Sequence, residues 1–370
     1  MIEFIIHIIP TVLILGVLIF IHELGHFLAC RLAGVGVEKF SIGFGPELLT
    51  WKGKETRYAV SLIPLGGFVK PKGETYEEIK ERGVSDPHDF LAASRWNRFL
   101  ILVAGVAMNF IFAYVLFVSV MVVGRPVLSP KIGGFIEGYP AQTSGFQVGD
   151  QVTHLNGIRV ANWQDLTLQI LQGHGGEPLN FSVLREGVPQ AIRVVPQVEE
   201  GHDIFGKSRR VPRIGIKPTE EFTIERYSLG EALVKSAQFE LRLTALTYEA
   251  LWHLVTGRLS LRSISGPIGI VSMAGSAAKM GVVALLQFTA ILSVSLAVIN
   301  LLPIPALDGG HLFFLILEVV RRKQVSLAFQ ERMTQIGFYF LMSLMLLVVY
   351  NDLVNIGAVD KIKSIFFRSG

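Results

Sequence analysis

Two histidines and a glutamate stand together at the end of a long apolar run, in the stretch FIHELGHFLAC (residues 20–30). His22 and His26 are four residues apart, so in a helix both imidazoles lie on one face and can bind the same metal ion. Glu23 is rotated from His22 by about 100°, which places its carboxylate beside the metal rather than on it. Zinc binds imidazole and activates water, and a neighbouring carboxylate can take the proton. The stretch therefore predicts a zinc-dependent hydrolytic centre.

The apolar context favours a functional reading of these residues. The pattern H-E-x-x-H is the signature of zinc metalloproteases, although in soluble helices the same letters often form only a polar face. Here the motif follows the run FIIHIIPTVLILGVLIF (4–20), and ionisable groups inside a membrane span are costly and by default functional. His7 stands alone near the other end of the run, and we give it no role.

A catalytic zinc usually has three protein ligands and one open position, so one ligand is still missing. The stretch VINLLPIPALDGGH (298–311) offers Asp308 and, as a rival, His311. Pro303 and Pro305 cannot continue a regular helix. Irregular backbone at membrane depth is tolerated only where it is buried in protein or lines a cavity. The residue types leave both candidate ligands open.

The elements that position these residues are expected to cross a membrane. Of 370 residues, 51% are hydrophobic and 17% charged, and the mean hydropathy is +0.49, which favours a membrane protein with one soluble insert. Four segments approach the roughly 20 apolar residues that a spanning helix needs, at 4–30, 99–123, about 282–302, and 336–350 extended to about 356.

Charge and cysteine content narrow the class further. Lys and Arg cluster between the first two spans and after the third, so the N-terminus and residues 125–225 are expected outside the cytoplasm. The net charge is +4, and the Lys and Arg residues form no stripe typical of nucleic-acid binding. We therefore expect no nucleic-acid partner. Cys30 is the single cysteine, which excludes an intrachain disulfide.

Residues 125–220 have the texture of a soluble α+β domain. Asn156-Gly157 is a tight-turn signal, Asn162 is a helix N-cap candidate, and Glu186-Gly187 separates two strand-like runs. The segment GYPAQTSGFQVGDQVTHLNG resembles a PDZ domain of bacterial proteases, and Ile214-Gly215-Ile216 resembles its carboxylate-binding loop. PDZ domains bind extended peptides at a sheet edge. A spacer or steric gate that grips no peptide is an equally open reading.

Residues 40–70 are expected to form a β-hairpin near the metal. YAVSLIPLGGFV (58–69) is strand-like, and SIGFGPELLTW (41–51) can pair with it across Lys52-Gly53-Lys54. A helical substrate hides its carbonyls in its own hydrogen bonds, so a protease that cuts it needs an edge strand. The alternative is a cytoplasmic loop without substrate contact.

The paired motifs resemble the site-2 protease family. The resemblance lies in two motifs, His22-Glu23-x-x-His26 and Asn300-x-x-Pro303-x-Pro305-x-Leu307-Asp308-Gly309. The loop 41–70 and the PDZ-like insert resemble the regulator-of-sigma-E protease branch of that family. The resemblance implies that His22, His26 and Asp308 bind zinc and that Glu23 is the general base. Gly105 and Asn109 match the family's pattern in the second span. Substrate contacts are expected from Asn300, Asn109, Gly43, Phe44, Gly45, Pro303 and Pro305.

The expected fold is an α-helical polytopic membrane protein of about four transmembrane helices, with a membrane-associated β-hairpin region and an inserted PDZ domain. The expected domains are helices one and two with the β region (1–124), a periplasmic PDZ domain (125–220), an amphipathic helix and loop (221–280), and helices three and four (281–370). Well-known members of the branch carry two PDZ domains, whereas this sequence shows one.

The expected function is intramembrane zinc proteolysis in the bacterial inner membrane. Its substrates would be single-span membrane proteins, such as anti-sigma factors, and remnant signal peptides, with the PDZ domain gating or binding substrate termini and lipid as the surrounding partner. Two other functions stay open. One is a non-enzymatic scaffold that works through the PDZ domain, and the other is a metal transporter using the same ligands.

Overall fold

The computed structural model describes residues 2–74, 78, 81–82, 86–173, 176–202, 208–260, 265–323 and 325–355. The chain forms two compact units. The first contains Met1–Val120, Leu229–Leu254 and Ser260–Gly370, and the second contains Met121–Ser228 and Val255–Leu259.

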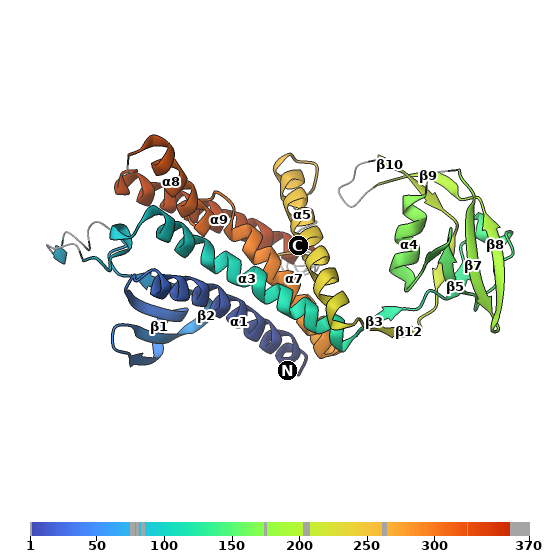
Figure 1. Cartoon of the computed structure of the whole chain (residues 1–370), viewed down its shortest axis with the longest axis horizontal. Coiled ribbons are helices and arrows are strands. Elements are labelled where there is room, and N and C mark those ends of the chain that lie inside the picture. The colour runs from blue at the N-terminus through green and yellow to red at the C-terminus, as the bar shows by residue number, and fades with distance from the viewer. Residues whose placement is uncertain are drawn as a thin grey trace, which may run out of the picture. The chain divides into compact units, whose positions relative to one another are not determined.

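Four helices of the described chain are long and apolar enough to cross a membrane, which confirms the expected class. They lie in α1 (Ile2–Leu32), α3 (Arg95–Val123), α7 (Val282–Asn300) and α9 (Leu327–Asn355), as Figure 1 shows. The predicted start of the fourth helix at 336 is wrong. Helix α9 begins nine residues earlier, and its polar residues Gln330, Glu331, Thr334 and Gln335 line a cavity.

Close contact between α1 and α3 depends on a glycine between the two motif histidines. A Cβ on Gly25 would lie 2.4 Å from the carbonyl oxygen of Ala104, so the absent side chain lets the two backbones meet. Ala113 and Phe117 of α3 pack on Val294 and Val298 of α7 in a second contact. The long helix α5 (Leu229–Val255) joins that cluster through Phe239, whose ring centroid is 5.0 Å from that of Phe117.

The loop expected within 221–280 is wrong in part, since Pro267–Met280 form a helix, α6. Proline suits the first helical turn because its missing N–H would have no partner there. Asp352 of α9 accepts hydrogen bonds from the backbone N–H groups of Gly266, Ile268 and Gly269, at 3.0–3.1 Å. A carboxylate at a helix N-terminus is favoured by the helix dipole, so α9 holds the start of α6.

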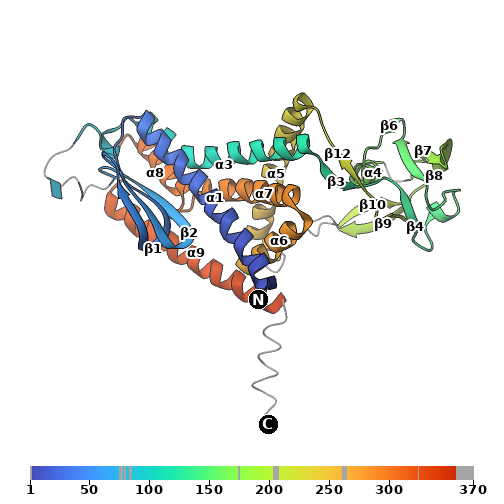
Figure 2. The same cartoon turned by 90° about the horizontal axis from the view of Figure 1, so that it is seen from below.

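Strands β1 (Val37–Lys52) and β2 (Arg57–Pro71) form an antiparallel sheet, as the hairpin prediction required. The pairs Trp51↔Tyr58 and Thr50↔Ala59 flank the turn. The first part of β1 also pairs with both ends of β2, since Phe40 is opposite both Tyr58 and Val69. Residues 67–71 thereby become an edge of the sheet, which lies beside α1 (Figure 2).

The second unit contains a four-stranded sheet in the order β6-β5-β7-β8, covered by α4 (Trp163–Gln172). Its strands are β5 (Gln151–Leu155), β6 (Ile158–Arg159), β7 (Leu179–Arg185) and β8 (Val188–Val194). The core is built from Val152, Leu155, Leu166, Phe181, Val183 and their buried neighbours.

Local predictions for this unit are confirmed. Asn156 and Gly157 have φ angles of 50° and 79°, and Glu186 and Gly187 have 50° and 85°, as tight hairpin turns require. The Asn162 side chain accepts a hydrogen bond from the Asp165 N–H, which caps α4.

Three two-stranded sheets complete the described part of the second unit. They pair β3 (Arg125–Leu128) with β12 (Phe222–Glu225), β4 (Ile132–Phe135) with β11 (Ile216–Pro218), and β9 (Gln197–His202) with β10 (Ser208–Arg213).

Candidate metal centre

Three side chains from two helices converge in the first unit. Among the described residues, His22, His26 and Asp308 form the one group of potential metal ligands, with donor atoms within 4.8 Å of one another. The Nε2 atoms of the two histidines are 3.3 Å apart. Asp308 Oδ2 lies 3.0 Å from His22 Nε2 and 3.4 Å from His26 Nε2.

This triangle of atoms has the dimensions of a zinc site. With Zn–N and Zn–O bonds of about 2.0–2.1 Å, neighbouring ligands in a tetrahedron are about 3.3–3.4 Å apart. The three observed separations, 3.0–3.4 Å, lie at or slightly below that value. Asp308 Oδ2 is buried and makes no well-aligned hydrogen bond, so its lone pairs are available to a cation. The residues therefore fit zinc, with a fourth position left for water or substrate.

Hydrogen bonds behind the histidines aim their Nε2 atoms at this centre. His26 Nδ1 lies 2.8 Å from the carbonyl oxygen of Ile101, to which it can donate. His22 Nδ1 lies 3.3 Å from the amide of Asn109, whose Oδ1 is buried and has no hydrogen-bond partner in the described part of the chain. Exchanging the amide oxygen and nitrogen, which are not distinguished by shape, gives Oδ1 the His22 N–H and satisfies both groups. Such supports fix the tautomer of a metal-binding histidine.

Gly105 of α3 makes room for both imidazoles. A Cβ at this position would lie 2.2 Å from His26 Nε2 and 2.8 Å from His22 Cε1. The ligand atoms thus pack directly against the α3 backbone, and only glycine fits.

The break between α7 and α8 delivers the aspartate. Helix α7 ends at Asn300, and α8 (Asp308–Arg321) begins at the ligand itself. A Cβ on Gly309 or Gly310 would lie 2.3 Å from a backbone carbonyl oxygen of the connection, so both glycines permit its tight winding. His311 lies three residues further along α8 and outside the ligand cluster.

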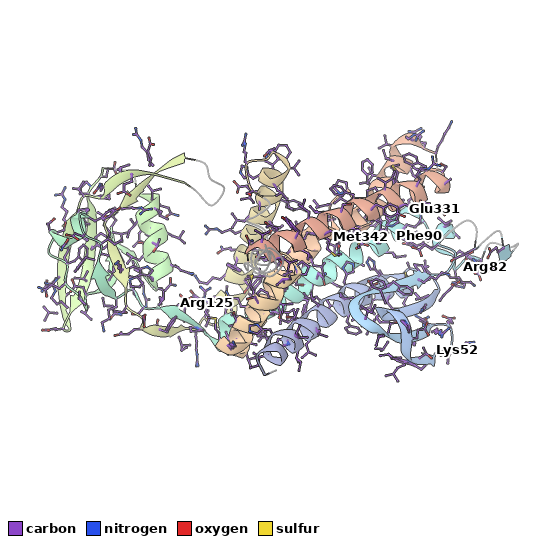
Figure 3. All side chains as sticks on the ribbon, turned by 180° about the vertical axis from the view of Figure 1, so that it is seen from behind. Lys52, Arg82, Phe90, Arg125, Glu331 and Met342 are labelled. Atoms are coloured by element: carbon purple, nitrogen blue, oxygen red, sulfur yellow. The ribbon has the colours of Figure 1, made fainter. Side chains whose placement is uncertain are left out.

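A cavity of about 560 Å³ opens beside the three ligands. Glu23 and His311 line it, and so do Phe90 and Glu331, which Figure 3 labels. The sheet edge contributes Phe68, Val69 and Pro71. A Cβ on Gly67 would lie 3.1 Å from Glu23 Cγ, so the edge runs directly past the glutamate. The arrangement places the Glu23 carboxylate, the three candidate metal ligands and an open strand edge around one cavity.

The residues expected to contact substrate lie at different places. Asn109 is fully buried against His22. The Phe44 ring stacks on Phe68 with centroids 6.5 Å apart, while Gly43 and Gly45 have φ angles of 90° and 84° in β1. None of these four expected contact residues lines the described cavity, and neither do Asn300 at the end of α7 or Pro303 and Pro305 in the α7–α8 connection. Their substrate contacts stay predictions.

Sequence reasoning missed a buried ion pair in the cavity wall. Arg98 Nη2 of α3 lies 3.3 Å from Glu318 Oε2 of α8, and both residues are almost fully buried. The available signal was a basic residue in α3 and an acidic residue in α8, both within apolar helices, since charges inside apolar segments usually pair.

Comparisons with known proteins identify the family of the chain. The family model for peptidase family M50 matches residues 10–344. Zinc metalloprotease RasP of Geobacillus kaustophilus is 30% identical, with 95% of this chain and 99% of the relative covered. Proteins of Brucella suis biovar 1 and Clostridium acetobutylicum, both named "putative zinc metalloprotease", are each 35% identical, with 94% of this chain and 94% or 97% of the relative covered. The chain therefore belongs to peptidase family M50, the family of the site-2 proteases, and is a zinc-dependent metalloendopeptidase.

Proposed function

We propose that this protein cuts membrane-spanning segments of single-span proteins, with zinc held by His22, His26 and Asp308. The observation that carries the proposal is the tetrahedral-sized triangle of ligand atoms, built on a helix long enough to cross a membrane. When bound, zinc supplies Lewis-acid activation of water and of the scissile carbonyl.

Glu23 is the proposed general base. Its position next to His22 on α1 puts its carboxylate on the cavity wall, one helical step away from the ligand face. There it takes the proton of the attacking water and passes it to the leaving amine. Because Glu23 is not one of the three clustered ligands, replacing it leaves zinc binding intact.

The edge formed by residues 67–71 is the proposed substrate clamp. Its inner side pairs with residues 37–42, and its outer side has no strand partner among the described residues. A substrate segment that leaves its helix recovers backbone hydrogen bonds by adding to this edge as a strand. Phe68 and Val69 then hold the extended segment beside Glu23, because both line the same cavity.

The second unit is proposed to be a single PDZ-like domain outside the cytoplasm that admits substrates by size. The carbonyls of Ile214 and Gly215 in its Ile214-Gly215-Ile216 loop accept hydrogen bonds from the backbone N–H groups of Ala141 and Ile136. A carboxylate-binding loop uses its own N–H groups, so these bonds leave peptide binding by the loop as the alternative to a gate. The proposed substrates that pass such a gate are bacterial inner-membrane proteins already trimmed by another protease, such as anti-sigma factors, and remnant signal peptides.

The decisive experiment compares wild type with Glu23→Gln on single-span substrates in detergent, with cleavage products identified by mass spectrometry. We expect cuts within the spanning segment, inhibition by chelator with recovery on adding zinc, and no cleavage by Glu23→Gln at full zinc occupancy. Normal cleavage by Glu23→Gln would refute the assigned base. Zinc flux into proteoliposomes without any cleavage would instead favour a transporter.

Strand addition is tested by cysteine crosslinking. The one native cysteine, Cys30, is buried and should not interfere with introduced cysteines. In the Glu23→Gln background, a cysteine at Phe68 on the cavity edge should crosslink to a substrate with cysteines near the scissile bond. A cysteine at Leu49, an exposed residue in the opposite edge strand, is the matched control. Equal crosslinking at both positions would contradict the clamp.

A further inference from the structure

The ion pair between Arg98 and Glu318 joins α3 to α8. Helix α3 packs against the two histidine ligands, and α8 carries the third ligand, Asp308. The pair spans 220 residues of sequence, and both partners line the same cavity as the three ligands. Their exposed fractions are 7% and 5%. Buried charges are paired because an isolated one is strongly penalised, so the two helices are held together at this point.

On α3, Arg98 shares a face with the groups that position the histidines. Ile101 follows it by three residues and Gly105 by seven, a spacing that repeats along one helix face. The Ile101 carbonyl receives the His26 N–H, and Gly105 gives both imidazoles their space. This face of α3 therefore sets the positions of the two histidine side chains.

On α8, Glu318 shares a face with the third ligand. Asp308, His311, Leu315 and Glu318 follow one another at intervals of three and four residues, and all four line the cavity. Asp308 stands in the first turn of α8, directly after an irregular connection. An anchor three turns further along the same face, at Glu318, constrains the rotation of α8 in addition to the connection.

We propose that Arg98 and Glu318 are positioning residues that set the place of Asp308 relative to His22 and His26, and thereby the zinc affinity. The inference rests on the proposed zinc ligands and extends the site to a pair that is not among the clustered ligands. Arg98 Nε is buried without a partner among the described residues, and the guanidinium reaches Glu318 through Nη2. The pair acts through α8.

The test measures the zinc dissociation constant of the purified full-length protein by competition with a chelator of known affinity. Arg98→Met and Glu318→Gln should each weaken zinc binding by about 10–100-fold, the usual effect of losing a group that supports a metal ligand. Arg98→Lys, which keeps the positive charge, should recover most of the affinity. Thermal unfolding of each zinc-free variant is recorded alongside.

The matched control is Arg125→Met in the second unit, where Arg125 Nη2 pairs with Glu225 Oε2 at 3.0 Å. It should lower stability and leave the zinc constant unchanged. Wild-type zinc affinity in both Arg98→Met and Glu318→Gln would overturn the inference, and so would equal weakening by Arg125→Met. Retention of zinc by Asp308→Asn would overturn the proposed ligand set itself, which separates the two failures.

Discussion

Replacing Gly105 by alanine should empty the metal site while leaving the helices folded. The added Cβ would stand 2.2 Å from His26 Nε2 and 2.8 Å from His22 Cε1. An ordinary contact is about 3.4 Å or more between such atoms, so the His26 ring has to move by roughly 1 Å. Metal–ligand distances are held to within about 0.2 Å, and the displaced ring can no longer close the triangle with Asp308.

The magnitude follows from this displacement. Losing a group that supports one metal ligand weakens metal binding by about 10–100-fold, and because the added Cβ displaces a ligand itself we expect zinc affinity to fall by about 100-fold or more. Helix α3 itself gains from the change, since alanine is favoured over glycine in a helix interior by about 1 kcal/mol. We therefore expect the Gly105→Ala protein to contain little zinc and to unfold at a normal temperature.

The assay is zinc content per chain after dialysis, measured together with thermal unfolding and substrate cleavage. Gly16→Ala is the matched control, because Gly16 also lies in a spanning helix and an added Cβ would meet no atom within 4 Å. It should keep full zinc and full activity. A Gly105→Ala protein that binds zinc as tightly as wild type would refute the packing of the ligands against α3.

Three further variants follow from the same contacts. Asn109→Leu leaves His22 Nδ1 without its support and should weaken zinc binding by about 10–100-fold in chelator competition, and unchanged affinity would contradict that role. Asp352→Ala removes three hydrogen bonds to the start of α6 and should lower the free energy of unfolding by about 2 kcal/mol or more, seen as a reduced Tm in detergent. Burial raises the pKa of the Asp150 carboxyl, but bonds from Arg185 and a backbone N–H outweigh it and hold that pKa below its ordinary 3.8. Its stabilisation is therefore complete above about pH 4 and lost as pH falls through the folded-state pKa, so Asp150→Asn should flatten the acid dependence of the Tm.

The metal ligands were predictable because their spacing carries the chemistry. His22 and His26 share a helix face by number alone, and the prolines before Asp308 mark irregular backbone inside an apolar segment. Spacing did not decide between Asp308 and His311, since both follow the break. The structure places the donor atom of Asp308 with the histidines, and their role as the ligand set remains the prediction tested below.

The features that were not predicted depend on which helices pack against each other, and helix packing could not be predicted from this single sequence. Asn109 was expected to touch substrate, but its position on the buried face of α3 brings it to His22. The hydrogen bonds that cap α6 come from Asp352, 86 residues after Gly266, so the sequence around Gly266 carries no local sign of them. Helix α9 extends through polar residues that line the cavity.

X-ray absorption at the zinc edge of the purified protein tests the central claim most directly. The account predicts two imidazole nitrogens and oxygen ligands at about 2.0–2.2 Å, with the metal lost in Asp308→Ala and retained in His311→Ala. A spectrum with three imidazoles, or zinc lost from His311→Ala and kept by Asp308→Ala, would contradict it.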